Sequence, residues 1–215
     1  MDRLRTLFSL VGTGEVFADV GCDHGYLAEM VLKSGNYKRV IISDISKSSL
    51  QKAVDLLKPY GDRVTAVVSD GLESFTELPD EVAIAGMGGE EIVKILSSAM
   101  SLPKKLVLAP QKNSVKVRKL LFDLGYKILK DFTIKDKGKF YDIISAVEAD
   151  IEPKEYTNLE YIYGRDNLNE RPDDFIEKLT LDEKLYEGVV QTKTASETAK
   201  SVAMQKLKEI REILK

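Results

Sequence analysis

The chain alternates short apolar runs with segments of helical periodicity, and this alternation restricts its fold more than any other feature. Runs rich in Val, Ile, Leu and Ala cover residues 16–20, 39–45, 63–70, 81–86 and 104–110. Each has the length of a strand that is buried on both faces. Segments with apolar residues three and four positions apart lie at 26–33, 46–58, 90–100 and 114–124. The alternation predicts an α/β fold with a parallel, doubly wound sheet.

The pattern changes in the second half of the chain. Residues 126–149 read as two strands joined by a turn at Asp136–Lys139, which predicts an antiparallel hairpin at one edge of a Rossmann-like sheet. A helical stripe then begins at Phe175, Ile176 and Leu179. A second apolar series has steps of three or four and comprises Ala195, Ala199, Ala203, Leu207, Ile210 and Leu214.

These two stripes predict a pair of long helices packed as an antiparallel, coiled-coil-like domain, with a break near Gly188. We therefore expect a Rossmann-like domain at 1–150 and a helical domain at 151–215.

Several features bear on where the protein works. Residues 1–14 hold a short apolar patch interrupted by charges, which predicts a helix packed on the fold and not a signal peptide. No apolar run approaches the roughly 20 residues that span a bilayer, so we expect no membrane association. Cys22 is the only cysteine, so no internal disulfide can form. We expect a cytoplasmic monomer, and without a Cys/His cluster we expect no metal.

Charge is distributed unevenly along the chain. The net charge is −3, but residues 104–139 carry eleven Lys or Arg against three acids, whereas residues 140–187 carry five against fourteen. Residues 188–215 have a balance of +3. A polyanion responds to local charge within about 10 Å. The basic stretch and the C-terminal helix are therefore candidates for binding nucleic acid, although lysines also simply solvate helix faces.

A glycine-rich turn follows the first predicted strand. Asp19 ends that strand, and Gly21 and Gly25 allow the backbone to turn and approach a ligand closely. The spacing is G-x-x-x-G, which differs from the dinucleotide fingerprint and disfavours a dehydrogenase. Asp23 would repel a phosphate but tolerates a cationic ligand such as S-adenosylmethionine. Asp19 could accept a hydrogen bond from the ammonium group of that ligand. The structural alternative is that Asp19 and Asp23 cap the following helix.

The next strands also end in polar or glycine-rich positions. Asp44 lies 23 residues after Gly21, a distance typical of an acid that binds ribose hydroxyls in any nucleoside-binding sheet. Asp70 is suited to accept from an adenine amine, with Gly71 leaving room for the ring, although a simple turn explains both residues equally well. The glycine-rich segment 85–89 would line the place where donor and acceptor meet, and Pro110–Asn113 offers amides to a base edge.

The motifs together resemble those of the bacterial tRNA (adenine(22)-N1)-methyltransferase family, TrmK. The matching segments are DVGCDHGYL (19–27), IISDI (41–45), SDGL (69–72), IAGMGGEEIVKIL (84–96) and LVLAPQKNSVKVRKLL (106–121), with LGYKI and FYDII further on. The resemblance covers roughly residues 1–165. The chain departs from the family at Ala28, where a proline is usual, and at Pro110–Asn113, where the family usually has QPN.

The resemblance implies a class I methyltransferase that uses S-adenosylmethionine to methylate N1 of an adenine in tRNA, and a helical domain that helps to hold the tRNA. It implies cofactor contacts from positions spread over four strand ends: Asp19, Gly21, Cys22, Asp44, Ile45, Asp70, Gly71, Ala85, Gly86, Met87 and Gly88. We expect Asp23 to stabilise the methylated, cationic ring, and Tyr26 or Met87 to stack on the extruded base. His24 reads as structural, and Cys22 is not expected to act as a nucleophile.

Two other functions fit the same cofactor site. A small-molecule methyltransferase would lack any need for the basic stretch, and its activity would not depend on tRNA. A non-catalytic module would bind S-adenosylmethionine without turnover on any RNA.

Overall fold

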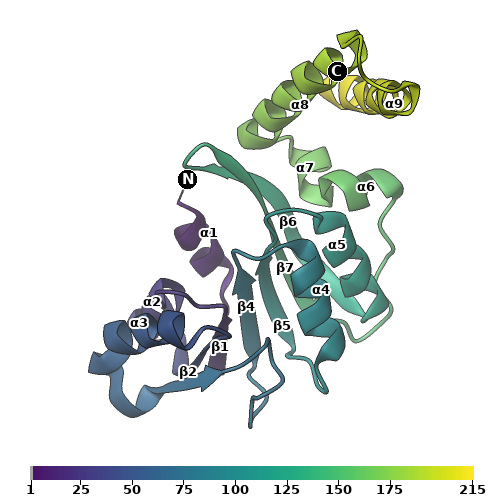
Figure 1. Ribbon diagram of the computed structural model, residues 1–215. Helices are drawn as coiled ribbons and strands as arrows, with labels where there is room; N and C mark the ends of the chain where they lie inside the picture. Colours follow the sequence, from purple (N-terminus) through teal and green to yellow (C-terminus); the bar gives the residue numbers. More distant parts are fainter. Residues whose placement is uncertain (1) are drawn as a thin grey trace.

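The computed structural model describes residues 2–215 and contains a seven-stranded sheet of order β3-β2-β1-β4-β5-β7-β6 (Figure 1). Its strands are β1 (Gly14–Val20), β2 (Tyr37–Asp44), β3 (Val64–Val68), β4 (Glu81–Ala85), β5 (Lys105–Ala109), β6 (Tyr126–Asp136) and β7 (Lys139–Glu148). The first five strands are parallel, and β7 is antiparallel to β5 and β6. The predicted doubly wound sheet with an edge hairpin is confirmed.

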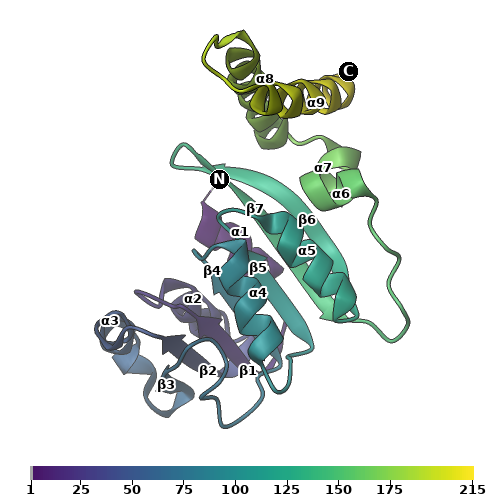
Figure 2. The same ribbon diagram turned by 45° about the vertical axis from the view of Figure 1, so that its right-hand side comes forward.

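Helices cover both faces of this sheet, as Figure 2 shows. On one face, α1 (Arg3–Leu10), α2 (Tyr26–Ser34) and α3 (Lys47–Leu57) enclose an apolar cluster that contains Leu7, Leu27 and Leu50. On the other face, α4 (Gly89–Ser98) and α5 (Ser114–Asp123) enclose a second cluster with the opposite side chains of the same strands. A 3₁₀ helix, η1 (Lys58–Arg63), leads into β3. The four predicted helices are confirmed, and the N-terminal helix packs on the fold as expected.

The β6–β7 hairpin is longer than the strand it joins. The last β5 residue paired with β7 is Leu108, opposite Ile144, whereas the β6–β7 pairing continues to Asp136 and Lys139. The hairpin therefore extends past the carboxyl end of β5 and forms a wall beside the edge of the sheet where parallel strands end (Figure 2).

Four helices follow the sheet: α6 (Asn158–Tyr163), α7 (Arg165–Glu170), α8 (Asp173–Gln191) and α9 (Glu197–Leu214). The short helices α6 and α7 were not predicted, because six residues are too few to display helical periodicity. Phe175 at the start of α8 packs in one cluster with Ile210 near the end of α9, so the two long helices are antiparallel as predicted.

Two details of the helical pair differ from the prediction. The α8 helix continues through Gly188 and breaks after Gln191, where Thr192 donates from its N–H and its hydroxyl back to the Gly188 carbonyl. A single exposed glycine costs a helix only about 1 kcal/mol, which packing against α9 offsets. The buried seam is also shorter than expected, because Ala195 lies in the turn and Ala199 is exposed.

Hydrogen bonds attach the helices that follow the sheet to the outer strand β6. The backbone N–H groups of Asp131, Thr133 and Lys135 each donate across 2.8 Å to a side-chain oxygen of the helices. The acceptors, in the same order, are Asp166, Asn167 and Asp174. Because alternate residues of β6 are used, these contacts fix the position of α7 and α8 along the strand.

A buried ionic group reinforces this junction. Arg118 of α5 is fully buried and donates to both carboxylate oxygens of Asp131 at 2.8–3.0 Å. It also donates to Asp142 of β7 at 3.1 Å and to the Tyr161 carbonyl of α6 at 3.1 Å. Burial disfavours its charge, but the two carboxylates outweigh that penalty and raise the pKa of the guanidinium. Arg118 is therefore a structural cation. It does not count among the positive charges of residues 104–139 that could bind nucleic acid.

Candidate functional site

A cavity of about 330 Å³ opens at the carboxyl ends of β1 and β4. Open α/β sheets bind their ligands at this edge. Its lining combines strand ends with residues of α1, α2 and the segment after β5: Arg3, Leu4, Asp19, Gly21, Cys22, Asp23, His24, Tyr26, Leu27, Ala85, Gly86 and Gln111. Seven of the residues predicted for the site are in this group. The pairing of β1 with β4 therefore brings together residues near position 20 and residues near position 85.

The turn after β1 has the geometry that its glycines imply. Gly21 and Gly25 both adopt left-handed backbone conformations, with φ of +71° and +73°. The N–H groups of Gly21 and Cys22 donate to the Ser43 carbonyl, which ties the turn to β2. A Cβ at Gly21 would collide with the Met87 methyl group. The positive φ is therefore the main reason for glycine at position 21, because the flexible end of the Met87 side chain could move aside.

Asp19 is the buried acid of the cavity. Its side chain is 5% exposed and accepts the N–H of Ala28 at 3.3 Å. Burial raises the pKa of Asp19 to about 7, and the nearby negative charge of Asp44 adds to the effect, although the Ala28 hydrogen bond opposes it. A buried carboxyl with one hydrogen bond has acceptor capacity left for a ligand. Burial likewise raises the pKa of the Cys22 thiol, which is then no thiolate nucleophile at neutral pH.

Asp23 is the exposed acid of the cavity. It has a left-handed backbone, with φ of +45°, and its N–H donates weakly to Asp44 at 3.4 Å. One carboxylate oxygen lies 2.8 Å from His24 Nδ1 and the other lies 3.7 Å from Lys52 Nζ. The His24 ring is parallel to that of Tyr26, with centroids 5.5 Å apart. Asp23, His24 and Tyr26 thus form one connected group at the mouth of the cavity.

The predicted residues at the carboxyl end of β2, Asp44 and Ile45, are not among the lining residues of this cavity. Asp44 accepts the Ser46 N–H at 2.7 Å through one oxygen and the Asp23 N–H through the other. Ile45 is 71% exposed. β1 and β2 are paired parallel neighbours, so both residues lie at the same edge of the sheet as the turn after β1.

The predicted residues after β3 have partners within the protein. Asp70 accepts from Lys94 of α4 at 2.7 Å. Gly71 has a φ of +65°, and a Cβ there would lie 2.7 Å from the Ile95 side chain. Gly71 was expected to leave room for an adenine ring, and that expectation stays a prediction. Close packing against α4 and the positive φ are both reasons for glycine at this position.

The glycine-rich segment after β4 is joined to the segment after β5. Gln111 donates from its side chain to the Gly86 carbonyl and from its backbone to the Met87 carbonyl, both at 2.8 Å. A Cβ at Gly89 would lie 2.5 Å from the Asn113 carbonyl oxygen. Ala85 and Gly86 line the cavity, whereas Met87 and Gly88 are not among its lining residues.

Two cavity residues of α1, Arg3 and Leu4, could not be predicted from the sequence. No motif marks them, because they enter the site only through the packing of α1 against α2 and the sheet. Gln111 was expected on the acceptor side as part of Pro110–Asn113, and its hydrogen bonds to the neighbouring segment could not be read from the sequence.

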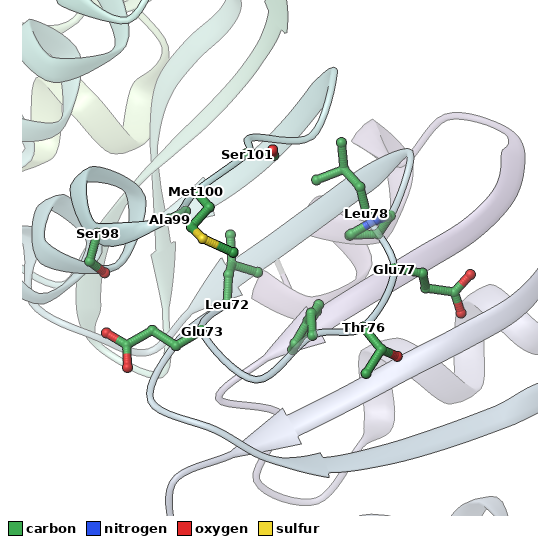
Figure 3. Close-up of a pocket in the computed structure, with 11 residues that line it drawn as sticks. Leu72, Glu73, Thr76, Glu77, Leu78, Ser98, Ala99, Met100 and Ser101 are labelled. Atoms are coloured by element: carbon green, nitrogen blue, oxygen red, sulfur yellow. The ribbon is translucent and has the colours of Figure 1, made fainter.

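A second, larger cavity of about 400 Å³ lies elsewhere, between residues 72–79 and the C-terminal end of α4 (Figure 3). Leu72, Leu78 and Met100 are among its apolar lining residues, and none of the predicted site residues contributes to it. Within residues 2–215 we find no group of three or more His, Cys, Asp or Glu side chains arranged to hold a metal. No helix in that range has the length and apolarity to cross a membrane.

Comparisons with known proteins bear on this site. A family model described as a methyltransferase domain matches residues 1–144. A Mycoplasma pneumoniae protein with the provisional name tRNA methyltransferase is 30% identical over 198 residues, which is 90% of each chain. The tRNA (adenine(22)-N(1))-methyltransferase of Bacillus subtilis is 27% identical over 154 residues, which is 69% of this chain and 65% of that protein.

A solved structure adds a ligand to the comparison. It is a Streptococcus pneumoniae protein, provisionally named a tRNA (m1A22) methyltransferase, in complex with S-adenosyl-L-methionine. It is 25% identical to this chain, with a TM-score of 0.89, and the match covers 99% of this chain and 98% of that chain.

Proposed function

The chain belongs to the methyltransferase domain family, and from this premise we propose that it methylates N1 of adenine 22 in tRNA with S-adenosylmethionine as the donor. The sequence motifs resemble those of the tRNA (adenine(22)-N1)-methyltransferase family, and relatives named for that activity confirm the resemblance. The proposal includes a cytoplasmic monomer that needs no metal.

One observation of the site carries the choice of donor. A buried acid, Asp19, and an exposed acid, Asp23, line one cavity beside bare glycine backbone. The exposed carboxylate of Asp23 would repel a phosphate-bearing cofactor, and both acids can accept from or face a ligand with a sulfonium and an ammonium group. The residues of this edge therefore fit S-adenosylmethionine, and they fit a dinucleotide poorly.

The proposed contacts follow the order of the strands. Asp19 accepts from the ammonium of the methionine part, and Asp44 accepts from the ribose hydroxyls. Asp70 accepts from the adenine amine, for which it has one oxygen besides the one held by Lys94. The other proposed contacts are made mainly by backbone and apolar groups: Gly21, Cys22, Ile45, Gly71, Ala85, Gly86, Met87 and Gly88.

When bound, S-adenosylmethionine supplies an electrophilic methyl group. The lone pair of adenine N1 is free at neutral pH, so the protein needs no strong base. Its residues must instead hold N1 about 3–3.5 Å from the methyl carbon and in line with it. Asp23 then stabilises the positive charge that develops on the ring. Tyr26, kept in place by its stacking on His24, supplies a face on which the extruded base rests.

The tip of the β6–β7 hairpin is the proposed contact for tRNA phosphates. Lys137 and Lys139 are exposed there, and no ion pair neutralises them among the residues that the structure describes. Because the hairpin extends past β5, these lysines stand beside the edge that holds the cavity. Lys112, also exposed, follows β5 at the same edge. Backbone phosphates bind such cations without regard to sequence.

The helical domain, residues 151–215, contributes shape more than charge. Arg211 of α9 is paired with Glu183 and Glu187 of α8, so part of the positive charge expected for the C-terminal helix is neutralised. We propose that this domain contacts the folded tRNA as a rigid spacer, since structured RNA is recognised largely by shape.

The decisive experiment incubates unmodified tRNA with S-adenosylmethionine labelled in its methyl group and maps the modified base. We expect label on N1 of adenine 22. Asp23→Ala is expected to keep the donor affinity within about tenfold and to lose most of the rate, because its role begins as the ring becomes cationic. Asp62→Ala, an exposed acid of η1, is the matched control.

Three results would contradict parts of this proposal. Normal turnover by Asp23→Ala would remove its assigned role. Methyl transfer to a small molecule but not to tRNA would identify a different substrate class. Binding of the donor without transfer to any RNA would indicate a non-catalytic module.

A further inference from the structure

The mouth of the cavity carries negative charge, although the proposed substrate is a polyanion. Asp23 lines the cavity, and its side chain is 61% exposed. Asp44 lies next to it and accepts a hydrogen bond from the Asp23 N–H. An extruded adenine enters the cavity with its own backbone phosphates at the mouth. The carboxylates would repel these phosphates, so the approach of RNA requires a cation beside Asp23.

Lys52 of α3 places a cation at this point. Its Nζ lies 3.7 Å from Asp23 Oδ1, and its side chain is 53% exposed. No other acid lies within ion-pair distance of Lys52 in the part of the chain that the structure describes. Leu50 and Ala53 of the same helix are buried in the core. The backbone of α3 is therefore fixed, whereas the long stem of Lys52 is able to move its ammonium between partners.

Asp23 keeps its place without Lys52. Its other carboxylate oxygen lies 2.8 Å from His24 Nδ1, and its N–H donates to Asp44. The 3.7 Å contact with Lys52 is longer than a hydrogen bond. An exposed ion pair of this kind shifts an equilibrium by about fivefold at most. Lys52 can therefore leave Asp23 for a stronger anion at little cost, and Asp23 stays at the mouth.

We propose that Lys52 exchanges partners when tRNA binds. In the free protein it neutralises Asp23, and in the complex it pairs with a backbone phosphate beside the extruded adenine. The exchange leaves the Asp23 carboxylate without its lysine while the adenine ring acquires positive charge, which is when that carboxylate is needed. This inference rests on the proposed function, because it requires RNA as the substrate.

Lys52 and the hairpin lysines lie on different sides of the cavity. The α3 helix packs on β2 and β3 at one end of the strand order, whereas Lys137 and Lys139 belong to the β6–β7 hairpin at the other end (Figure 1). The cavity opens between them, at the carboxyl ends of β1 and β4. An extruded nucleotide has a phosphate on each side, so an RNA strand that crosses the mouth would meet a cation at both.

The salt dependence of tRNA binding tests the phosphate contact. One such contact contributes about 0.7–0.9 to the slope of log affinity against log salt. We expect Lys52→Gln to reduce the slope by this amount and to weaken tRNA binding about 3- to 8-fold at roughly 0.1 M salt. Lys52→Arg keeps the charge and should restore both values. Donor affinity should stay within about twofold and kcat at saturating tRNA within about threefold, because Asp23 remains in place.

A double-mutant cycle with Asp23→Asn tests the exchange itself. Asp23 competes with the phosphate for Lys52, so removing its charge leaves the lysine fully available to tRNA. Lys52→Gln should therefore cost about two- to fivefold more tRNA affinity in the Asp23→Asn background than in the unmodified protein. Lys58→Gln is the matched control and should leave the slope unchanged. Lys58 is exposed at the other end of α3 and has no ion pair among the residues that the structure describes.

Three results would overturn the inference while the proposed function stands. The first is a slope that Lys52→Gln leaves unchanged or that Lys58→Gln reduces equally. The second is an equal loss of tRNA affinity in both backgrounds of the cycle. The third is a fall in kcat without any change in tRNA binding, which would make Lys52 a residue that only positions Asp23. If the unmodified protein transfers no methyl group to tRNA, the proposed function itself fails.

Discussion

The protonation of Asp19 makes donor binding dependent on pH in a predictable direction. Burial raises the pKa of this carboxyl to about 7, so the ligand-free protein keeps it protonated in mildly acidic solution. A protonated carboxyl is a poor partner for the ammonium of S-adenosylmethionine. Apparent affinity should therefore rise with pH, in proportion to the ionised fraction of Asp19.

The magnitude follows from that pKa. About a tenth of Asp19 is ionised at pH 6 and about three-quarters at pH 7.5, so the apparent Kd should fall about eightfold across this interval. Calorimetric titration at several pH values measures it. Asp19→Asn should bind more weakly and show a flat profile. His24→Asn is the matched control, because it changes another polar side chain that lines the same cavity and leaves Asp19 in place.

The opposite slope is expected for the stability of the ligand-free protein. Unfolded Asp19 loses its proton near its ordinary pKa of 3.8, whereas folded Asp19 keeps it until about pH 7. The unfolded state therefore binds fewer protons between these values, and the contribution of Asp19 to stability falls as pH rises through that window. A pH-independent Kd in the unmodified protein, or a pH profile that survives in Asp19→Asn, would refute this account of the site.

Two further predictions concern the junction and the tRNA contact. Arg118→Met should destabilise the protein by about 3–5 kcal/mol, because it leaves buried carboxylates without a counterion. Thermal unfolding followed by circular dichroism measures the loss, and an unchanged Tm would contradict the prediction. Lys137→Gln with Lys139→Gln should weaken tRNA binding and reduce the slope of log affinity against log salt by about 1.4–1.8. The pair Lys104→Gln with Lys127→Gln, at the other end of the strands, should leave that slope nearly unchanged; equal effects of both pairs would remove the hairpin from the contact.

The sheet and much of the site were predictable because their signals are local. Apolar runs identify strands that are buried on both faces, and the rule that ligands bind at strand carboxyl ends selects Asp19 and Asp23 without any knowledge of contacts. Both residues line the cavity that the structure contains. The hairpin was predictable for the same reason, since its turn contains Gly138 in a left-handed conformation.

What could not be predicted depends on contacts between distant segments. Arg118 reads in the sequence as one more surface cation, and only the packing of α5 against β6 reveals that it is buried. Gly71 looks in the sequence like room for a ligand, and only the structure shows that Ile95 of α4 also packs closely against it. Arg3 has no motif around it, and its place in the cavity follows from where α1 packs. Each of these residues has a role that long-range packing alone determines.

The bonds from α7 and α8 to β6 also affect how a shortened form of the protein would behave. An edge strand with free N–H groups is a template for strands of other molecules, and such edges cause aggregation unless something covers them. Asp166, Asn167 and Asp174 provide that cover here, at three successive outward-facing positions of β6. A truncated chain ending near residue 150 would lose them and expose a strand of eleven residues to intermolecular pairing. We therefore expect α7 and α8 to help prevent the outer strand of the sheet from pairing with other molecules.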